Sequence, residues 1–505
     1  MGFGSVGPPK SHQRTAMSIT AALGVLASAH IGDEDLVLER VVHAHAAQMI
    51  LNSMRLRCST SRIMIIIAPI AQYRVLSKYC IAAIFAINVK SAARGDEMEY
   101  IRRDAEREFL SLCEEYPVVL VTGMRQAGKS TMLEHFLDEQ RKHVTLDDLQ
   151  ERALAQEDPE LFLQSHEPPV MIDEVQYAPE LFPYLKIWAD RHPDAMGDVW
   201  LTGSQPFSLM RLAGESLSGR VGITHLLPLS QHELFGQGEL EPLAVDLGAM
   251  RDRSANRAPA TLPEMNERIY RGSMPAVASG RHKDPARFYR SYQQTYIERD
   301  VRGLDQAADM VEFSRFMAAV ASQVGQTLNI ESLARDVGIP RRKAQSWLAV
   351  LELSDIVFLL QPYSNNALAR TIKTPKLFFN DTGLAAWLGR WTSPESIGAG
   401  AMGGALFENY VVSEVRKTIV NSGDPAALWY YRDRDAKEID IVLECDGMLH
   451  PLEVKRSANP QASAARAFPI LDRSTLRRGA GAIICMKQDV GALPGGTLYV
   501  PAWAI

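Results

Sequence analysis

The sequence predicts an α/β protein of several domains: a parallel-sheet domain, then a mainly helical module, then a small α/β domain. Its 505 residues are enough for about three domains of ordinary size. Apolar runs alternate with helical patterns over residues 117–230, which favours a parallel sheet with helices on both faces. Residues 328–363 follow a helix–turn–helix–strand pattern, and Asp446-Gly447 separates two alternating runs, as in a β-hairpin.

Composition narrows the class of protein. With 46% hydrophobic and 23% charged residues, the chain resembles a soluble globular protein. The formal net charge of −6 argues against a generally basic nucleic-acid binder, so any such contact would come from a local patch. The five cysteines form no CxxC pair and have no histidine partners at zinc spacing. We therefore expect reduced thiols and a cytoplasmic protein rather than a disulfide framework.

Residues 1–97 do not share the patterning of the rest. Their apolar runs at 63–71 and 80–89 are shorter than the roughly 18 residues that a membrane helix needs, so no membrane partner is expected. The opening residues lack the order of a secretory signal. We interpret 1–97 as an atypical extension or the product of a wrongly chosen start. Met98 is then the natural beginning, because coherent patterning starts there.

The first motif is a phosphate-binding loop in its required context. An apolar strand runs into "GMRQAGKST" (123–131), and a helical pattern follows. In the spacing G-x-x-x-x-G-K-S, Gly123 and Gly128 let backbone amides close around phosphates. Lys129 adds a point charge, and Ser130 can bind Mg²⁺. Together with the next residue, Thr131, these positions predict a nucleotide site for ATP.

The second half of such a site is an apolar strand that ends in an acid, and "VMIDE" (170–174) supplies it. Asp173 would help to hold Mg²⁺, and Glu174 would orient or deprotonate the attacking water. Ser204 ends the strand pattern at 198–204, where it could sense the terminal phosphate. Arg220 precedes the last strand pattern. It is either a charge stabiliser acting on a neighbouring copy, in a homo-oligomer, or a residue that packs a loop.

Several stretches together resemble one family, the AAA-type ATPases of bacteria and archaea that join a P-loop domain to a C-terminal domain of unknown function with a nuclease-like fold. The similarity covers nearly everything from residue 98 to about 472. The matching stretches are "VTGMRQAGKST", "VMIDEVQ", "LTGSQ", "YIERDVR" (296–302), "PKLFFNDTGLAAWL" (375–388), "EIDIV" and "LEVKRS" (452–457).

The resemblance implies a fold and a set of boundaries. It implies an α/β parallel-sheet P-loop ATPase domain, a helical and winged-helix module, and a small α/β restriction-endonuclease-like domain. It defines no physiological role, because that role is poorly defined across the family. We set the ATPase core at 98–235, a helical lid or linker at 236–308, the winged-helix module at 309–390 and the nuclease-like domain at 391–505.

The helix–turn–helix pattern carries a cluster of cations. Arg341, Arg342 and Lys343 open the second helix, whose N-terminal part would enter the major groove of DNA. There they would suit phosphate contacts. The alternative is a packing module whose basic residues are merely solvated.

The Asp446-Gly447 turn predicts the register of the C-terminal hairpin. Position 445 would face 448, and continuing the count places Asp440 directly across from Glu453. Lys455 lies two residues further and shares the face of Glu453. Two carboxylates this close suit a hard cation such as Mg²⁺, which could activate a water for attack on a phosphodiester.

Two further residues bear on this hairpin. The resemblance implies that Glu408, on the helix predicted at 404–419, supplies a third acidic ligand. The alternative for Glu408 is an exposed glutamate favoured by the helix dipole. For Asp440, Glu453 and Lys455 the alternative is that they form a charged, solvent-exposed face of the hairpin. Pro451 has no backbone N–H to donate to the neighbouring strand, which can introduce a bulge and shift the register of the hairpin.

We therefore expect an ATPase in which Lys129 and Glu174 serve MgATP hydrolysis and Asp440, Glu453 and Lys455 serve cleavage of nucleic acid. A second hypothesis is a nucleotide-dependent switch or partner-binding protein whose nuclease-like fold no longer cuts. A third is a DNA-binding regulator that acts through the helix–turn–helix.

Overall fold

The computed structural model describes residues 100–505, except 205, 237–239, 298–308 and 365–372. The chain divides into two units, residues 1–97 and residues 98–505. The atypical N-terminal stretch lies outside the described residues, as does most of "YIERDVR". Among the described residues, no helix combines the length and apolar character that crossing a membrane requires.

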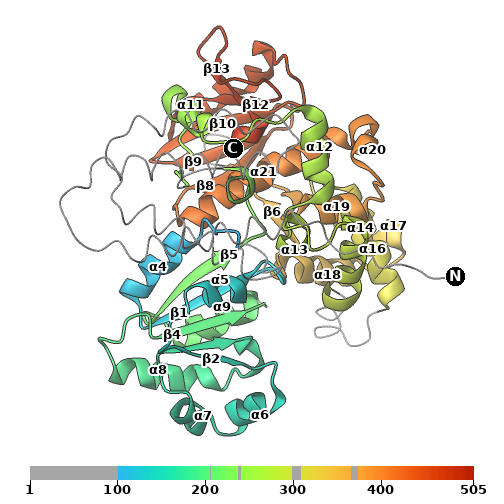
Figure 1. The fold of residues 1–505 in the computed structure, drawn as a ribbon. Helices are drawn as coiled ribbons and strands as arrows, with labels where there is room; N and C mark the ends of the chain where they lie inside the picture. The colour runs from blue at the N-terminus through green and yellow to red at the C-terminus, as the bar shows by residue number, and fades with distance from the viewer. Residues whose placement is uncertain (1–99, 205, 237–239, 298–308, 365–372) are drawn as a thin grey trace, which may run out of the picture. The chain divides into compact units, whose positions relative to one another are not determined.

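The parallel-sheet domain has the alternation that the sequence predicts. Its five strands are all parallel in the order β2-β3-β4-β1-β5, so the strand that leads into the glycine-rich loop lies between β4 and β5 (Figure 1). The strands are β1 (Val118–Gly123), β2 (Lys142–Thr145), β3 (Val170–Asp173), β4 (Val199–Gly203) and β5 (Val221–Leu226). The helices are α4 (Glu106–Glu115), α5 (Lys129–His135), α6 (Leu149–Glu157), α7 (Pro159–Ser165), η2 (Val175–Tyr177), α8 (Leu181–Arg191), α9 (Pro206–Ser216) and α10 (Gln231–Phe235).

Each face of this sheet has its own apolar core. One core collects Val118, Leu120 and Leu201 with residues of α6 to α9, and the other collects Val119 and Val121 with residues of α4 and α5. Every residue of β1 is buried, as expected for a central parallel strand covered on both sides.

The middle module, residues 236–390, is mainly helical. Its helices are α11 (Leu247–Ala255), α12 (Leu262–Arg271), α13 (Pro275–Ala278), α14 (Pro285–Tyr292), η3 (Gln293–Ile297), α16 (Met310–Ser322), α17 (Ile330–Val337), α18 (Arg341–Leu353) and α19 (Thr382–Leu388). Helix α17 ends at Gly338, which adopts the left-handed conformation, and α18 starts three residues later. An antiparallel hairpin of β6 (Val357–Leu360) and β7 (Lys376–Phe379) follows. The helix, turn, helix and strand predicted for 328–363 are therefore present.

The C-terminal domain, residues 391–505, combines one long helix with a mixed sheet in the order β13-β14-β12-β10-β9-β8, in which β11 pairs separately with β10. Its strands are β8 (Ala427–Arg432), β9 (Glu438–Cys445), β10 (Met448–Val454), β11 (Arg477–Arg478), β12 (Ala482–Cys485), β13 (Gly491–Ala492) and β14 (Leu498–Pro501). Its helices are α20 (Pro394–Ala399), α21 (Gly403–Ser422), η4 (Ala462–Arg473) and η5 (Ala502–Ala504).

The β9–β10 hairpin has the predicted register. Met448 pairs with Cys445 and Leu452 with Ile441, and Asp446 and Gly447 both have positive φ, as the predicted two-residue turn requires. Pro451 pairs with Val442 without a register shift, so it does not displace the two residues of interest. The paired positions stop one step before Asp440 and Glu453.

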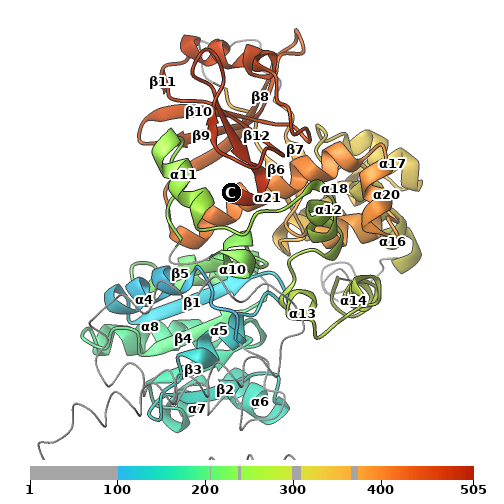
Figure 2. The ribbon, with the colours of Figure 1, turned by 45° about the horizontal axis from the view of Figure 1, so that its top comes forward.

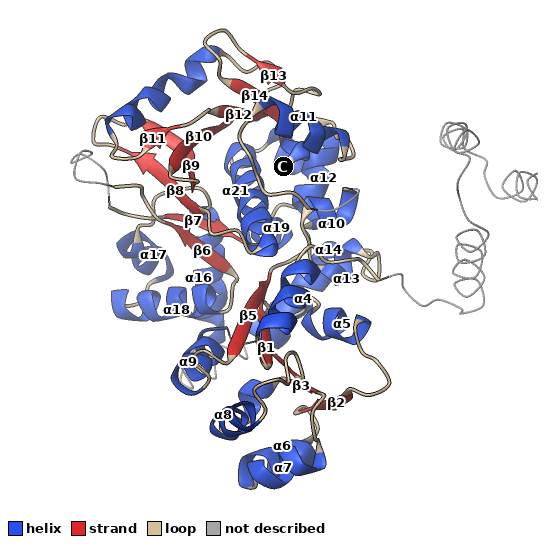
Figure 3. Ribbon diagram, turned by 90° about the vertical axis from the view of Figure 1, so that its left-hand side faces the viewer, coloured by secondary structure: helices blue, strands red, loops and turns tan. Residues whose placement is uncertain are grey.

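One apolar core joins the middle module to the C-terminal domain. It includes Phe316 and Leu377 of the first and Phe407, Val411 and Trp503 of the second. Helix α21 runs between the C-terminal sheet and the helices of the middle module (Figure 2). The β6–β7 hairpin is tied to β8, where Tyr363 N donates to Tyr430 O at 2.7 Å (Figure 3).

Candidate functional site

Two glycines shape the phosphate-binding loop between β1 and α5. Gly123 has φ of +138°, and a Cβ there would lie 2.2 Å from the carbonyl oxygen of Leu226 in β5. Gly128 has φ of +92°. Both positions therefore require glycine, the first for close approach of the neighbouring strand and the second for a left-handed backbone.

Lys129 is the first residue of α5, and its side chain is fully enclosed. Its Nζ donates to the carbonyl oxygens of Gly123 and Met124, each at 3.0 Å. Burial lowers the pKa of Lys129 to about 8, and the neighbouring charge of Arg125 acts in the same direction, while Glu174 and Asp173 oppose it. The amine thus connects two carbonyl groups of the loop. A bound anion would raise its pKa and so keep it fully charged.

Ser130 and Asp173 meet beside the loop, as expected. Ser130 Oγ donates to Asp173 Oδ1 at 2.9 Å, and the hydroxyl of Thr202 in β4 donates to the same oxygen. A hydroxyl and a carboxylate at the edge of a phosphate loop are the oxygen ligands that Mg²⁺ prefers, so this donor set fits that ion. Thr202 was not singled out from the sequence, although it stands two residues before Ser204.

Glu174 follows β3 with a left-handed backbone, at φ of +57°. Its Oε2 accepts from Ser204 Oγ at 3.1 Å and from the side-chain amide of Gln176, and that amide also contacts Ser204 Oγ at 3.3 Å. Glu174 and Ser204, which were each predicted to belong to the nucleotide site, therefore lie together. Gln176, which sequence reasoning missed, fixes the orientation of the carboxylate.

These residues open onto a cavity of about 690 Å³. Arg103, which precedes α4 and was also missed, stabilises its rim: Nη1 donates to Ala127 O at 2.6 Å and Nη2 to Leu227 O at 2.7 Å. The lining residues are Tyr100, Ile101, Arg103, Arg125, Gln126, Gly128, Lys129, Ser130, Thr131, Asp147, Glu174, Tyr177, Ser204, Leu229, Pro275, Ala276, Ser279, Arg281 and His282. The last five come from the middle module, so the cavity lies between that module and the loop.

Arg220 lies at the other end of the sheet. It precedes Val221, which pairs with Val118 at the start of β1, whereas the loop begins after Gly123. Six strand residues separate the two levels by roughly 20 Å, which is beyond the reach of an arginine side chain. Arg220 pairs with Asp190 of its own domain. A contact with a nucleotide in the same chain is thereby excluded, and action on a neighbouring copy stays a prediction.

Two of the three cations at the start of α18 have acidic partners in the chain. Lys343 Nζ lies 2.7 Å from Glu312, and Arg341 Nε lies 3.2 Å from the exposed Glu331. Arg342 is exposed. The cluster predicted to contact DNA phosphates is thus partly neutralised within the module.

The carboxylates predicted in the C-terminal domain converge, but they already have partners. Asp440 Oδ2 accepts from the backbone N–H of Val454 at 2.8 Å, and Glu453 Oε1 accepts from Lys455 Nζ at 2.6 Å. Glu408 of α21 accepts from Lys376 Nζ at 2.8 Å. Lys376 belongs to β7 of the middle module, and nothing in the local sequence pattern marked it.

The environment of these carboxyls disfavours their charge. Burial raises the pKa of Glu408 to about 7, and the charge of Asp440 adds to this effect, against the opposing influence of Lys376. Burial and Asp440 also raise the pKa of Glu453 to about 7. The pKa of Asp440 is raised by burial as well, with Lys376 opposing.

That Asp440, Glu453 and Glu408 hold a metal ion stays a prediction. Within the part of the chain that the structure describes, no group of three or more His, Cys, Asp or Glu side chains is placed to hold a metal ion. The ammonium group of Lys376 contacts Glu408 Oε1, and that of Lys455 contacts Glu453 Oε1, so two lysines lie where a metal ion would have to bind. The residues therefore do not fit a divalent cation in this arrangement.

Comparison with known proteins defines the class of the first domain. The model of the AAA domain family matches residues 115–235, so the chain carries an AAA-type P-loop ATPase domain. Models of two domains of unknown function match further on, DUF8612 at 262–395 and DUF4143 at 403–505.

Two curated relatives and two solved structures each match more than half of this chain. Two uncharacterized proteins, one of Mycobacterium bovis and one of Mycobacterium tuberculosis, are each 28% identical over 379 residues, which is 74% of this chain and 78% of theirs. A Walker-type ATPase of Pyrococcus abyssi is 18% identical, with a TM-score of 0.36, over 58% of this chain and 97% of its own. A RuvB variant of Thermotoga maritima is 15% identical, with a TM-score of 0.26, over 53% and 93% of the two chains.

Proposed function

We propose that this protein hydrolyses ATP in the cavity between the phosphate-binding loop and the middle module. The observation that carries the proposal is the fixed carboxylate of Glu174, held by Gln176 and Ser204 beside Lys129 and Ser130. A P-loop that only binds nucleotide has no need of an oriented base at this position.

The roles follow from the geometry. Backbone amides of the loop and the amine of Lys129 bind the phosphates, and Ser130 and Asp173 would hold Mg²⁺. When bound, Mg²⁺ neutralises charge that develops on the phosphate oxygens. Glu174 orients a water toward the terminal phosphate, and Ser204 keeps the carboxylate in place. Leu229, Pro275 and His282 also line the cavity, where they would contact a bound nucleotide.

Two substitutions test the assignment. Glu174→Gln is expected to bind ATP with nearly unchanged affinity while kcat falls by about 10²-fold or more, because only the water-activating group is lost. Lys129→Ala is expected to lose nucleotide binding itself. Glu139→Gln, at an exposed glutamate on a neighbouring loop, is the matched control. Turnover that survives in Glu174→Gln would show that another group activates the water.

A second candidate function is action on nucleic acid by the C-terminal domain, driven or gated by the ATPase. It is supported by the convergence of Glu408, Asp440, Glu453 and Lys455 at one end of the β9–β10 hairpin. The test is incubation with linear, branched and single-stranded DNA, with and without ATP, beside Asp440→Ala. Cleavage lost in Asp440→Ala favours this function. ATP turnover without cleavage favours a nucleotide-dependent switch with a non-cutting effector domain.

A further inference from the structure

A lysine from a different part of the chain occupies the carboxylate cluster of the C-terminal domain. Lys376 Nζ lies 2.8 Å from Glu408, 2.5 Å from Glu438 and 3.9 Å from Asp440. Its side chain is only 3% exposed. The three carboxylates come from α21 and β9, whereas Lys376 opens β7 of the middle module.

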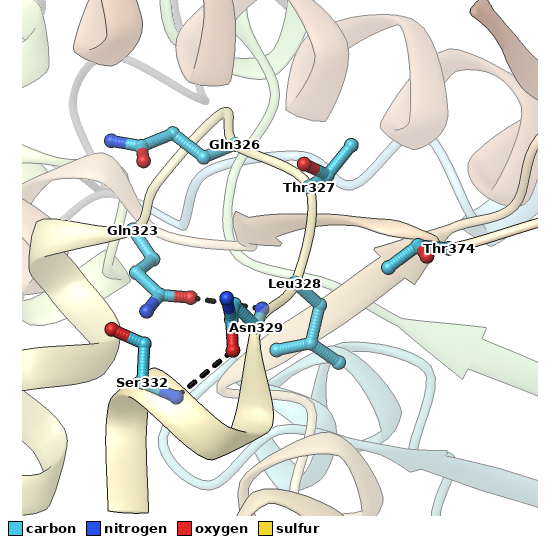
Figure 4. Close-up of a pocket in the computed structure, with 7 residues that line it drawn as sticks. All are labelled: Gln323, Gln326, Thr327, Leu328, Asn329, Ser332 and Thr374. Carbon is cyan, nitrogen blue, oxygen red and sulfur yellow. Dashed lines mark hydrogen bonds between the residues drawn. The ribbon is translucent and has the colours of Figure 1, made fainter. Parts of the chain in front are cut away.

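The backbone of Lys376 is held from three sides. Strand β7 pairs with β6 on one edge. On its other edge Gly325 N donates to Leu377 O at 2.8 Å and Leu328 N donates to Pro375 O at 2.8 Å. That segment leads into α17, whose first turn is capped by Asn329, and Figure 4 shows Thr327 and Leu328 next to Thr374 at this place.

Helix α21 provides the third contact that fixes the backbone of β7. The side chain of Asn409 accepts from Phe379 N at 2.7 Å and donates to Phe379 O at 2.9 Å, as a neighbouring strand would. Asn409 follows Glu408 directly. The position of Lys376 against the cluster is therefore set by rigid elements rather than by a free side chain.

Charge and space both oppose a second cation. A divalent metal would need oxygens at about 2.0–2.6 Å from Glu408, Asp440 and Glu453. The ammonium of Lys376 already lies within 4 Å of two of these groups, and Lys455 lies on the third. Among the described residues, Glu453 Oε2 is the one cluster oxygen that is buried and has no hydrogen-bond partner, and one oxygen does not make a metal site.

We propose that Lys376 is the resident cation of this cluster, an autoinhibitory contact that closes the nuclease-like domain to divalent metal. Opening the site requires β7 to withdraw, and this couples the cluster to the hairpin and to the helix–turn–helix that precedes it. The inference goes beyond the ATPase assignment, because it holds whether or not the protein hydrolyses ATP.

The experiment is a Mn²⁺ titration of the full chain without nucleotide, followed by electron paramagnetic resonance. A site is attributed to the cluster only if Asp440→Asn removes it, which separates it from binding at Ser130 and Asp173. Wild-type protein is expected to show no such site. Lys376→Met is expected to gain one, with affinity at least about 100-fold above that of the wild type, because a buried like charge has been removed. Lys437→Met, at an exposed lysine before β9, should behave as wild type.

Three results would overturn the proposal. One is an Asp440-dependent Mn²⁺ site in the wild-type protein. Another is a Lys376→Met variant that melts cooperatively and gains no site. Should that variant not fold, labelling of wild-type Lys376 by an amine-reactive reagent decides. Slow labelling that millimolar Mn²⁺ leaves unchanged supports the proposal, whereas labelling accelerated by Mn²⁺ shows that metal displaces the ammonium and contradicts it.

Discussion

At the scale of single residues, Lys129 connects burial to nucleotide binding. In the free protein its amine is enclosed, hydrogen-bonded only to backbone carbonyls and has a pKa lowered to about 8. The phosphates of a bound nucleotide would place several negative charges beside it and raise that pKa again. Binding is therefore linked to uptake of a proton.

The sign of the pH dependence follows from this linkage. Below pH 8 the amine is charged in both states, and affinity for ATP is expected to be flat. Above pH 8 the free protein loses the proton first, so affinity should fall by up to about tenfold per pH unit. Calorimetry near pH 8 in two buffers of different ionisation heat should detect uptake of a fraction of a proton. Lys129→Arg, which stays charged throughout, should bind without this dependence. An affinity that is constant from pH 7 to pH 9.5 would contradict the assignment.

The residues of the nucleotide site fall into two groups: those that a short sequence motif predicts, and those whose partners lie far away along the chain. Lys129, Ser130, Asp173 and Glu174 stand in short motifs whose chemistry depends on spacing alone, so sequence places them. Arg103 acts through carbonyls 24 and 124 residues away, and no local pattern records such contacts. Gln176 had a weak signal, since it follows Glu174 by two residues at the end of a buried strand.

At the scale of elements, the packing of α21 against β7 depends on one buried side-chain amide, that of Asn409. Asn409 is completely buried and satisfies both the N–H and the C=O of Phe379. Without it, these two backbone groups would have no partner at a place that water does not reach. Each such group costs about 1–3 kcal/mol.

Asn409→Leu, which keeps the number and branching of side-chain heavy atoms, is therefore expected to lower the free energy of unfolding by about 3 kcal/mol. Chemical denaturation followed by circular dichroism measures it. Asn256→Leu, at an exposed asparagine after α11, is the control and should change stability by less than about 0.5 kcal/mol. Equal stability of the two variants would mean that the Phe379 groups find other partners.

The same elements show how far sequence predicts a fold. The two-residue turn at Asp446-Gly447 fixes the β9–β10 register because side-chain periodicity leaves one pairing, and Pro451 does not disturb it. The strands of the first sheet were predicted because apolar runs alternate with helices. Lys376 could not be found in this way, since it meets Asp440 across 64 residues and four intervening elements. The contacts of Lys376 change the interpretation of the cluster, from carboxylates that are free to bind a metal ion to carboxylates that are paired with a lysine.

At the scale of the whole described chain, apolar packing joins the middle module to the C-terminal domain. The cores on the two faces of the first sheet contain residues of the parallel-sheet domain alone. The largest core draws on both later parts, together with Met124 and Ala127 of the phosphate loop. Two residues of the phosphate loop thus belong to the same apolar core as Ile505 at the end of the chain.

A shared core predicts that the middle module does not fold without the C-terminal domain. A chain that ends at residue 390 would expose part of the core in which Leu377, Phe378 and Leu384 are fully buried, because that core also contains residues of α21. Each such side chain contributes about 1.5–3 kcal/mol when buried, so losing several is comparable with the 5–15 kcal/mol by which a domain is ordinarily stable. Limited proteolysis should then cut α11 to α19 rapidly while the parallel-sheet domain resists. Affinity for ATP should fall at least about tenfold, because Pro275 and His282 would no longer be held as part of the cavity lining. Co-expression of residues 391–505 should restore both properties. A truncated chain whose middle module resists protease as the full chain does would show that the two parts fold independently, and α21 would then be a docked helix rather than part of their common core.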